Sequence, residues 1–316
     1  MKSTNTKLRL IGICAFGLLS GCASTPASTD NTIARGELTD DSMDVLFATE
    51  FPVQSEQEAL LRADQATKEG DTDRALFFLV RALQFRPGNV PLLVRIGQAQ
   101  MQRQNLVFAK RAFVMALHYE PDHAVALEGV GLIYSSQGQD ERAVACLHQA
   151  VDNDPGLWRA HNALGIYADK AGDFPTAQRH YDAALATNPD AAYVLNNRGY
   201  SKYLAGDMQG AKLDFYEAAR NRGFLPAWAN LGMIYAEGGQ YRDAIKSYKL
   251  VMSEASAFNN AGHAAIENGD FDEAEQYLTE AIRLSPKYFP SAEENMALLR
   301  ERKQYEADNV TQADSG

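Results

Sequence analysis

The chain is poor in cysteine and in positive charge. Its 316 residues include three cysteines, at positions 14, 22 and 146, which are too few for a disulfide framework and lack the paired spacing of zinc ligands. Lys and Arg number 30 against 41 Asp and Glu, which gives a formal net charge of −11. Because phosphate backbones are bound by clustered Lys and Arg, this balance argues against nucleic acid as a partner.

Sequence motifs of catalysis are also missing. The chain has no Gly-x-x-x-x-Gly-Lys-Ser/Thr phosphate loop, no His-Glu-x-x-His and no Gly-x-Ser-x-Gly. Gly129-Val130-Gly131 lacks the third glycine of a dinucleotide-binding loop, and we interpret it as helix packing. The six histidines follow no common pattern, and Cys146 is interpreted as a small half-buried hydrophobe. We therefore predict no catalytic residue, no metal site and no cofactor.

The N-terminus carries an apolar run too short to span a bilayer comfortably. Lys2, Lys7 and Arg9 precede the apolar residues 10–19, and small residues follow, which predicts a secretory signal peptide over residues 1–21. Leu19-Ser20-Gly21-Cys22 resembles the lipobox of bacterial lipoproteins. That resemblance implies cleavage before Cys22 and acylation of this residue, with palmitate among the acyl chains. An ordinary signal peptide with a chance cysteine is the alternative.

A lipidated Cys22 would anchor the mature chain to a membrane without spanning it, because two or more acyl chains hold a protein stably. Ala23 follows Cys22 where an Asp would signal retention, so the resemblance to lipoproteins implies the outer membrane and its periplasmic face. Residues 22–55 are predicted to be a tether and docking segment. Its first part is small and polar, whereas residues 45–53 are more apolar and are expected to dock on the first helices.

The rest of the chain repeats. Small residues recur in three parallel series, and the steps within the first two are 34, 34, 34, 34, 33 and 30 residues. The first series is Ala63, Gly97, Gly131, Gly165, Gly199, Gly232 and Gly262. The second is Ala75, Ala109, Ala143, Ala177, Ala211, Ala244 and Ala274. The third is Ala82, Ala116, Ala150, Ala184, Ala218, Val251 and Ala281.

This pattern resembles the tetratricopeptide repeat (TPR), with seven copies over residues 56–288. The resemblance implies an all-α fold, a right-handed superhelical solenoid of paired helices. Gly-Asp pairs are expected to end each first helix and cap the second one, as at 70–71, 172–173, 206–207 and 269–270. Residues 289–303 suit a charged C-terminal capping helix, and residues 304–316 a disordered tail. Around residues 252–258 the link is four residues short, which predicts an irregular junction.

TPR proteins bind partners along the concave face formed by the first helices, so the resemblance implies a peptide-binding site there. Asparagine offers both a donor and an acceptor to an extended peptide, and tyrosine offers apolar area with a polar tip. The alternative is that asparagine is merely tolerated on an exposed face and that some tyrosines pack between repeats. The predicted binding residues are Asn162, Tyr193, Asn196, Asn197, Tyr200, Tyr203, Asn230, Asn259 and Asn260.

Two segments narrow the resemblance further. Leu-Asn-Asn-Arg-Gly-Tyr-Ser-Lys-Tyr-Leu-Ala-Gly-Asp at 195–207 and Asn-Asn-Ala-Gly-His at 259–263 resemble the TadD family, the TPR lipoproteins of Tad/Flp pilus assembly. This resemblance implies a non-catalytic scaffold with a pilotin-like role, whose partners are pilus and secretion components, a secretin among them. Two alternatives stay open: an NlpI-like adaptor for peptidoglycan hydrolases or proteases, and a PilF-like pilotin of type IV pili.

Overall fold

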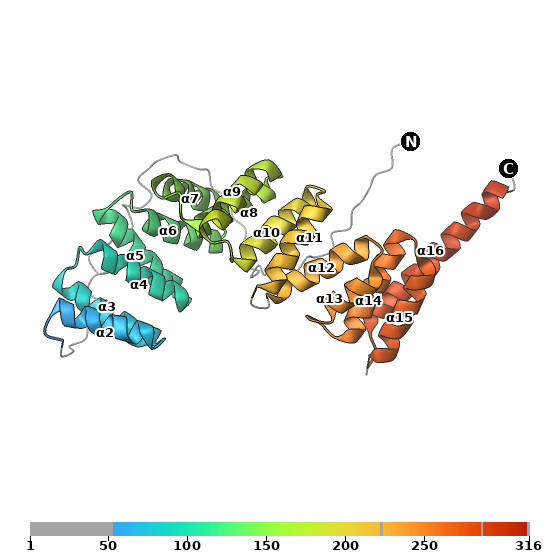
Figure 1. Ribbon diagram of the computed structural model, residues 1–316, viewed down its shortest axis with the longest axis horizontal. Coiled ribbons are helices and arrows are strands. Elements are labelled where there is room, and N and C mark those ends of the chain that lie inside the picture. Colours follow the sequence, from blue (N-terminus) through green and yellow to red (C-terminus); the bar gives the residue numbers. More distant parts are fainter. Residues whose placement is uncertain (1–52, 222–223, 286, 315–316) are drawn as a thin grey trace. The chain divides into compact units, whose positions relative to one another are not determined.

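The computed structural model describes residues 53–221, 224–285 and 287–314, and this part of the chain consists of helices and short connections without a strand (Figure 1). The predicted all-α class is confirmed. The chain divides into two compact units at residues 189 and 190. We call the described residues 53–189 the N-terminal unit and residues 190–314 the C-terminal unit.

The N-terminal unit is a stack of four antiparallel helix pairs. In each pair the two helices pack on one another, and the second helix also contacts the first helix of the next pair. First helices of neighbouring pairs touch as well, as α4 with α6 and α6 with α8 do. The helices are α2 (Glu56–Lys68), α3 (Thr72–Phe85), α4 (Val90–Gln102), α5 (Leu106–Tyr119), α6 (Ala124–Ser136), α7 (Asp140–Asn153), α8 (Trp158–Lys170) and α9 (Phe174–Thr187).

The C-terminal unit stacks three further pairs and a last single helix. Contacts between α10 and α12 and between α14 and α16 again join first helices to their successors. The helices are α10 (Ala192–Leu204), α11 (Met208–Arg220), α12 (Leu225–Glu237), α13 (Tyr241–Tyr248), α14 (Glu254–Asn268), α15 (Phe271–Leu284) and α16 (Pro290–Asp314).

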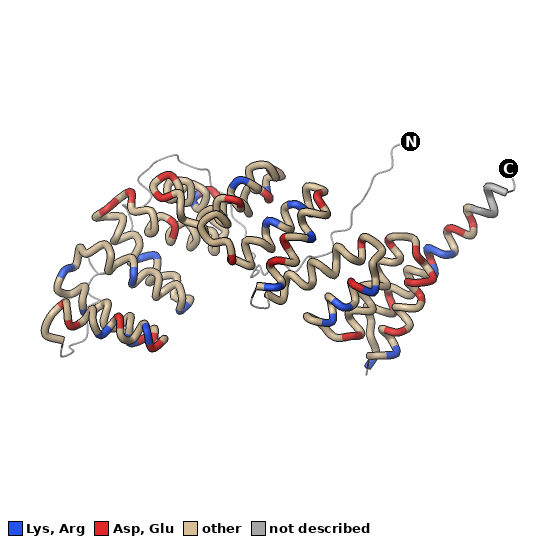
Figure 2. The backbone as a smooth tube through the Cα atoms, in the orientation of Figure 1, with Lys and Arg blue, Asp and Glu red and all other residues tan. Residues whose placement is uncertain are grey.

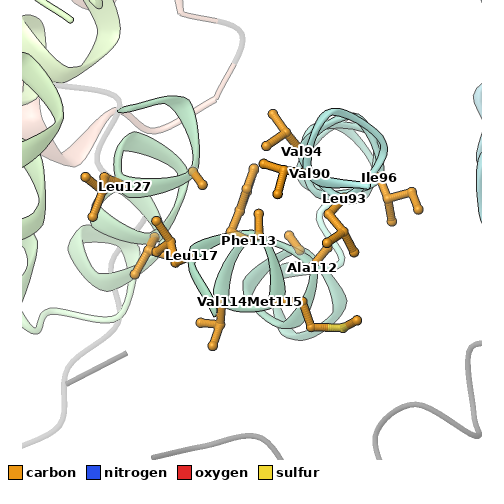
Figure 3. Close-up of a cluster of buried hydrophobic side chains, with 14 of the residues drawn as sticks. Val90, Leu93, Val94, Ile96, Ala112, Phe113, Val114, Met115, Leu117 and Leu127 are labelled. Atoms are coloured by element: carbon orange, nitrogen blue, oxygen red, sulfur yellow. The ribbon is translucent and has the colours of Figure 1, made fainter. Parts of the chain in front are cut away.

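The small residues of the repeat pattern leave room for large side chains that pack between the helices. A Cβ atom on Gly97 would lie 2.6 Å from Cε1 of Phe113, which is 1% exposed. Figure 3 shows Phe113 on α5 between the helices that carry Val90 and Leu127. Gly129 faces the same ring, and a Cβ on Gly131 would lie 2.8 Å from Cγ of Leu147. The packing interpretation of Gly129-Val130-Gly131 is therefore confirmed.

The predicted helix boundaries are confirmed where glycine precedes aspartate. Gly172 ends α8 with a φ of 75°, and the Asp173 side chain accepts the backbone N–H of Thr176 to cap α9. Gly269 likewise has a φ of 82°, but Asp270 makes no side-chain cap. Its carboxylate instead accepts a hydrogen bond from the Tyr241 hydroxyl, so a contact between repeats replaces the local cap.

The short junction is accommodated by the helix before it. Helix α13 has 8 residues and ends at Tyr248, whereas the corresponding helix α15 has 14. Val251 therefore lies in a turn rather than in the helix that the third small-residue series places there. Ser253 caps α14 by accepting the N–H of Ser256. Helix α13 is therefore nearly two turns shorter than α15, and it still packs against α14.

The chain ends differ in part from the sequence interpretation. Helix α16 continues to Asp314, eleven residues beyond the predicted end at 303, because residues 304–314 contain neither Gly nor Pro. Charges of both signs follow one another along it (Figure 2). Val53, at the end of the predicted docking segment, packs against the N-terminal core. The predicted signal peptide, Cys22 and residues 23–52 lie outside the described residues.

Candidate protein-interaction site

Four of the predicted binding asparagines are buried, and three of them form hydrogen bonds with the amide of another asparagine. Asn196 on α10 is 9% exposed, and Asn230 on α12 is 7% exposed. The Asn230 Nδ2 donates to Asn196 Oδ1 at 2.8 Å. Asn259 on α14 is 7% exposed and accepts from Nδ2 of Asn295 on α16 at 3.0 Å. The side-chain amides of these residues form hydrogen bonds with asparagines of a neighbouring repeat or of α16, so the prediction that they face a peptide is wrong.

The physical reason lies in the register of the first helices. The fifth residue of α6 and of α10 lies where that helix touches the first helix of the next repeat. At that position in α6, buried Glu128 accepts the backbone N–H of Ala160 on α8 at 3.0 Å. Helix α8 lacks a side-chain cap of its own, so Glu128 supplies one from the preceding repeat. Burial raises the pKa of this carboxyl group.

The other predicted asparagines differ in how far they are exposed to solvent. Asn162 on α8 is 9% exposed, so it too is largely removed from solvent. Asn197 is half-buried on α10. Asn260 is half-buried on α14, and its Nδ2 lies 3.4 Å from the Met252 sulfur at the irregular junction. A role in peptide binding stays a prediction for Asn197 and Asn260.

The three predicted tyrosines share α10. Tyr193 is 37% exposed, whereas Tyr200 and Tyr203 are half-buried with ring centroids 6.0 Å apart. The Tyr203 hydroxyl donates to Oε1 of Glu237 on α12 at 2.5 Å. Burial and this carboxylate raise the pKa of Tyr203. Tyr203 therefore joins two repeats, Tyr200 packs in part against the core of the C-terminal unit, and Tyr193 is the most exposed of the three.

Beside these tyrosines lies a charged cluster that the sequence interpretation missed. Asp214 on α11 is 5% exposed. Arg198 on α10 contacts both of its carboxylate oxygens, at 2.7 and 2.8 Å, and Lys202 lies 2.8 Å away. Two cations on one carboxylate leave a surplus of one positive charge. The sequence holds one signal of it, the spacing of four between Arg198 and Lys202, which places both on one side of α10.

The structure also brings together three histidines that follow no common pattern in sequence. His161 on α8 and His180 on α9 place their Nδ1 atoms 3.1 Å apart, and the ring of His148 on α7 lies 6.1 Å from that of His180. Burial, aided by the neighbouring rings, lowers the pKa of His180 to about 4. Among the described residues, no group of three His, Cys, Asp or Glu side chains is arranged to hold a metal ion.

Two of these histidines border a groove in the N-terminal unit. It encloses about 620 Å³ between α7, α8 and α9. Its lining includes His148, His180, Asp140 and Tyr167, and none of the predicted binding residues. The Tyr167 hydroxyl donates to Oγ of Ser135 at 2.9 Å and to Oδ1 of Asp140 at 3.2 Å. Cys146 is half-buried nearby on α7, and burial raises its pKa, which leaves its thiol protonated and unreactive.

The helix pairs, with their small residues at the crossings, match known proteins. Three family models, each described as a tetratricopeptide repeat, match residues 126–157, residues 162–226, and the two segments 225–254 and 255–288. The chain is a tetratricopeptide-repeat protein. Folds of this family generally serve as non-catalytic scaffolds that bind proteins, and the matching models indicate no enzyme family.

Solved structures of TPR proteins share this fold at low sequence identity. A tetratricopeptide repeat protein from Parabacteroides merdae is 17% identical, with a TM-score of 0.50 over 78% of this chain and 100% of that one. PilF of Pseudomonas aeruginosa is 20% identical, with a TM-score of 0.52 over 66% and 96% of the two chains. The C-terminal part of a TPR protein from Cytophaga hutchinsonii is 15% identical, with a TM-score of 0.51 over 73% and 97%. These likenesses establish the fold.

None of the helices described for this TPR protein is both long and apolar enough to cross a bilayer.

Proposed function

We propose that this TPR protein is a non-catalytic scaffold for Tad/Flp pilus assembly, anchored by lipid at Cys22 to the periplasmic face of the outer membrane. The observation that carries the proposal is Leu19-Ser20-Gly21-Cys22, a lipobox directly after an apolar run, upstream of seven helix pairs built for protein binding. A secretin is the expected client, because a pilotin-like lipoprotein would bring that channel to the outer membrane.

The C-terminal unit supplies the proposed contact surface for the client. Tyr193 and Tyr200 present aromatic area on α10, and Asn197 lies beside them on the same helix. The surplus positive charge of Arg198 and Lys202 over Asp214 lies next to this surface. An aromatic surface bordered by a guanidinium is a composition enriched at the centre of protein interfaces. We propose this surface as the binding site in place of the buried asparagines.

A single substitution at the lipidation site tests the anchor. Cys22→Ser removes the thiol that accepts the diacylglyceryl group, while the tether separates it from the helices. We expect the variant to leave the outer-membrane fraction with an unchanged circular dichroism spectrum, and secretin multimers and Flp pili to be lost from the cells. A variant that still fractionates with the outer membrane would show that Cys22 is not the anchor.

The same strain separates the alternative functions. If Flp pili persist while type IV pili are lost, the chain acts as a PilF-like pilotin. The likeness to PilF is one of fold and does not favour that outcome in advance. If both kinds of pili persist and peptidoglycan hydrolases or proteases copurify with the wild type, the chain is an NlpI-like adaptor.

A pair of aromatic substitutions tests the contact surface. Tyr193→Ala combined with Tyr200→Ala removes its aromatic area, and we expect recovery of the secretin with the tagged chain to fall at least about tenfold. The matched control is Tyr216→Ala with Tyr288→Ala, two other exposed tyrosines of the C-terminal unit, 45% and 78% exposed. Equal secretin recovery with both double variants, each of them well folded, would place the client elsewhere.

A further inference from the structure

The groove between α7, α8 and α9 has an apolar floor and an acidic rim. Val144, Leu164 and Ala168 lie along its floor, and its volume of about 620 Å³ falls within the usual range of ligand pockets. Asp140, Glu141 and Asp173 line its edges. Asp140 is paired with Lys170 at 3.3 Å. All residues that line the groove belong to the N-terminal unit, whereas the α10 surface proposed above belongs to the C-terminal unit.

Two of the rim carboxylates are available to a cationic partner. No ion pair joins Glu141 or Asp173 to a Lys or Arg within the part of the chain that the structure describes. Asp173 accepts hydrogen bonds from Thr176, which lower its pKa and keep it ionised. Glu141 is exposed on α7. The positive charge of Arg179 also acts on Asp173, and Lys170 pairs with Asp140, so three rim carboxylates face two cations and the edge keeps a net negative charge.

The histidine contacts add a further hydrogen-bond acceptor. The carbonyl oxygen of Pro155 can only accept, so His161 donates to it through Nε2 over 3.2 Å. The neutral His161 ring then has an unprotonated Nδ1, which accepts from Nδ1–H of His180 over 3.1 Å. His180 is left with an unprotonated Nε2 on a ring that lines the groove. Its pKa of about 4 keeps that nitrogen an acceptor near neutral pH.

Apart from His180 and the exposed His148 ring, two side-chain donors line the groove, and both are engaged. The Tyr167 hydroxyl binds Ser135 and Asp140, and Thr176 binds Asp173. The lining then offers an apolar floor, carboxylates, the His180 acceptor and the exposed His148 imidazole. Lys and Arg fit such a place, because their alkyl stems pack on apolar surface while the charged end reaches acceptors.

We propose that this groove binds a protein segment in which a Lys or Arg is flanked by apolar residues. It is a second interaction surface, in another unit from the proposed client surface on α10, and it does not depend on which assembly system the protein serves. The charge complementarity of the rim selects a basic segment over an acidic one. The apolar floor selects it over a purely polar polycation.

The test uses the full chain in detergent and a fluorescein-labelled peptide, Gly-Leu-Arg-Leu-Arg-Leu-Gly, followed by fluorescence anisotropy at physiological salt. We expect saturable binding, and a loss of at least about tenfold in affinity when both arginines of the peptide are replaced by glutamine. The groove variant Asp140→Asn/Glu141→Gln/Asp173→Asn should also bind at least about tenfold more weakly. The asparagine at 173 retains the ability to cap α9.

A matched control separates the groove from the general acidity of the chain. Glu120→Gln/Asp122→Asn/Asp152→Asn removes three exposed carboxylates of the same unit outside the groove. This control should change the affinity by less than about twofold, because screening weakens charges that do not touch the peptide. Equal losses in the two triple variants would mean that the peptide is held by net charge alone, and the proposal would be wrong.

Two further variants leave the charge unchanged. Ala145→Trp, at an exposed position lining the groove, should fill it and weaken binding at least about tenfold without disturbing the fold. His180→Phe keeps the aromatic ring and removes the acceptor, and should weaken binding about threefold or more. Unchanged peptide affinity in Ala145→Trp, with a native circular dichroism spectrum, would overturn the assignment of this groove.

Discussion

Asn230 on α12 donates a hydrogen bond of 2.8 Å to Asn196 on α10, and the two residues are 34 positions apart in the sequence. Both side chains are buried, so each amide makes with the other a hydrogen bond that it would otherwise make with water. The same arrangement recurs between Asn295 and Asn259. These pairs hold first helices of successive repeats in register, which is a structural role in the place where the sequence suggests a binding one.

Breaking this pair should cost stability. Asn196→Ala leaves the buried Asn230 amide without its acceptor, and we expect a loss of about 1 to 3 kcal/mol in the free energy of unfolding. Urea denaturation followed by circular dichroism measures it. Gln209→Ala, at an exposed position of α11, is the control and should stay within about 0.5 kcal/mol. A loss for Asn196→Ala no larger than the control's would mean that the pair contributes nothing.

Glycine at the helix crossings should not tolerate even a methyl group. A Cβ on Gly165 would lie 2.6 Å from Cε1 of Tyr181, which is 1% exposed and cannot move away freely. We expect Gly165→Ala to lower stability by about 1 to 3 kcal/mol through overpacking. A Cβ on Gly238 would meet its nearest atom at 3.4 Å, so Gly238→Ala should change stability by less than about 0.5 kcal/mol. Thermal melts of the two variants would distinguish them, and equal midpoints would contradict the packing.

The buried carboxylate of the charged cluster should matter more than an exposed one. Asp214→Ala leaves Arg198 and Lys202 facing each other without their shared partner, and we expect a loss of about 3 kcal/mol. Asp243, which pairs with Lys246 at 2.9 Å, has 49% of its side chain exposed. Asp243→Ala should therefore cost less than about 1 kcal/mol. The comparison is made by urea denaturation, and similar losses for both would show that burial does not strengthen the cluster.

The histidine cluster should make stability depend on mild acid. The pKa of His180 is about 4 in the folded chain against an ordinary 6.5, so the unfolded chain binds more protons between these values. Stability is therefore present above pH 6.5 and is lost as the pH falls towards 4. Solvent reaches part of the ring, so we expect this loss to be about 1 to 2 kcal/mol.

His180→Phe isolates that contribution. Denaturation of the wild type and of this variant at several pH values between neutral and 4 gives the difference in stability. The variant should lose less stability over this range, because it has no imidazole to protonate at this position. Parallel curves for the two proteins would mean that His180 titrates near its ordinary pKa.

Much of the local structure follows from the sequence because its causes are local. Gly172-Asp173 marks the end of α8 and the start of α9, since a positive φ suits glycine and a carboxylate suits a helix N-terminus. At Gly269-Asp270 only the glycine behaves as expected. Asp270 instead accepts a hydrogen bond from Tyr241, one repeat earlier in the chain, and no local sequence pattern predicts that contact.

The candidate site was harder to predict. Tyr193 is exposed as expected, but Asn196 differs from it by only three positions and is buried. A single helix gives the direction of a side chain, while its exposure depends on which helix packs against that side. Asp214 and His161 show the same limit, because the partners that define their environments lie 16 and 19 residues away.

The sequence by itself determined the repeat, its seven copies and most helix ends, because small residues at a fixed period and helix-end signals act within one repeat or one helix. Only the tertiary structure decided which polar side chains face solvent, that α13 would shorten at the irregular junction, and that two histidines and an acidic rim would border one groove. Those outcomes depend on contacts between repeats. Each first helix repeats the same pattern, but the burial of a polar side chain such as Asn196 depends on the side chain that the next repeat places against it.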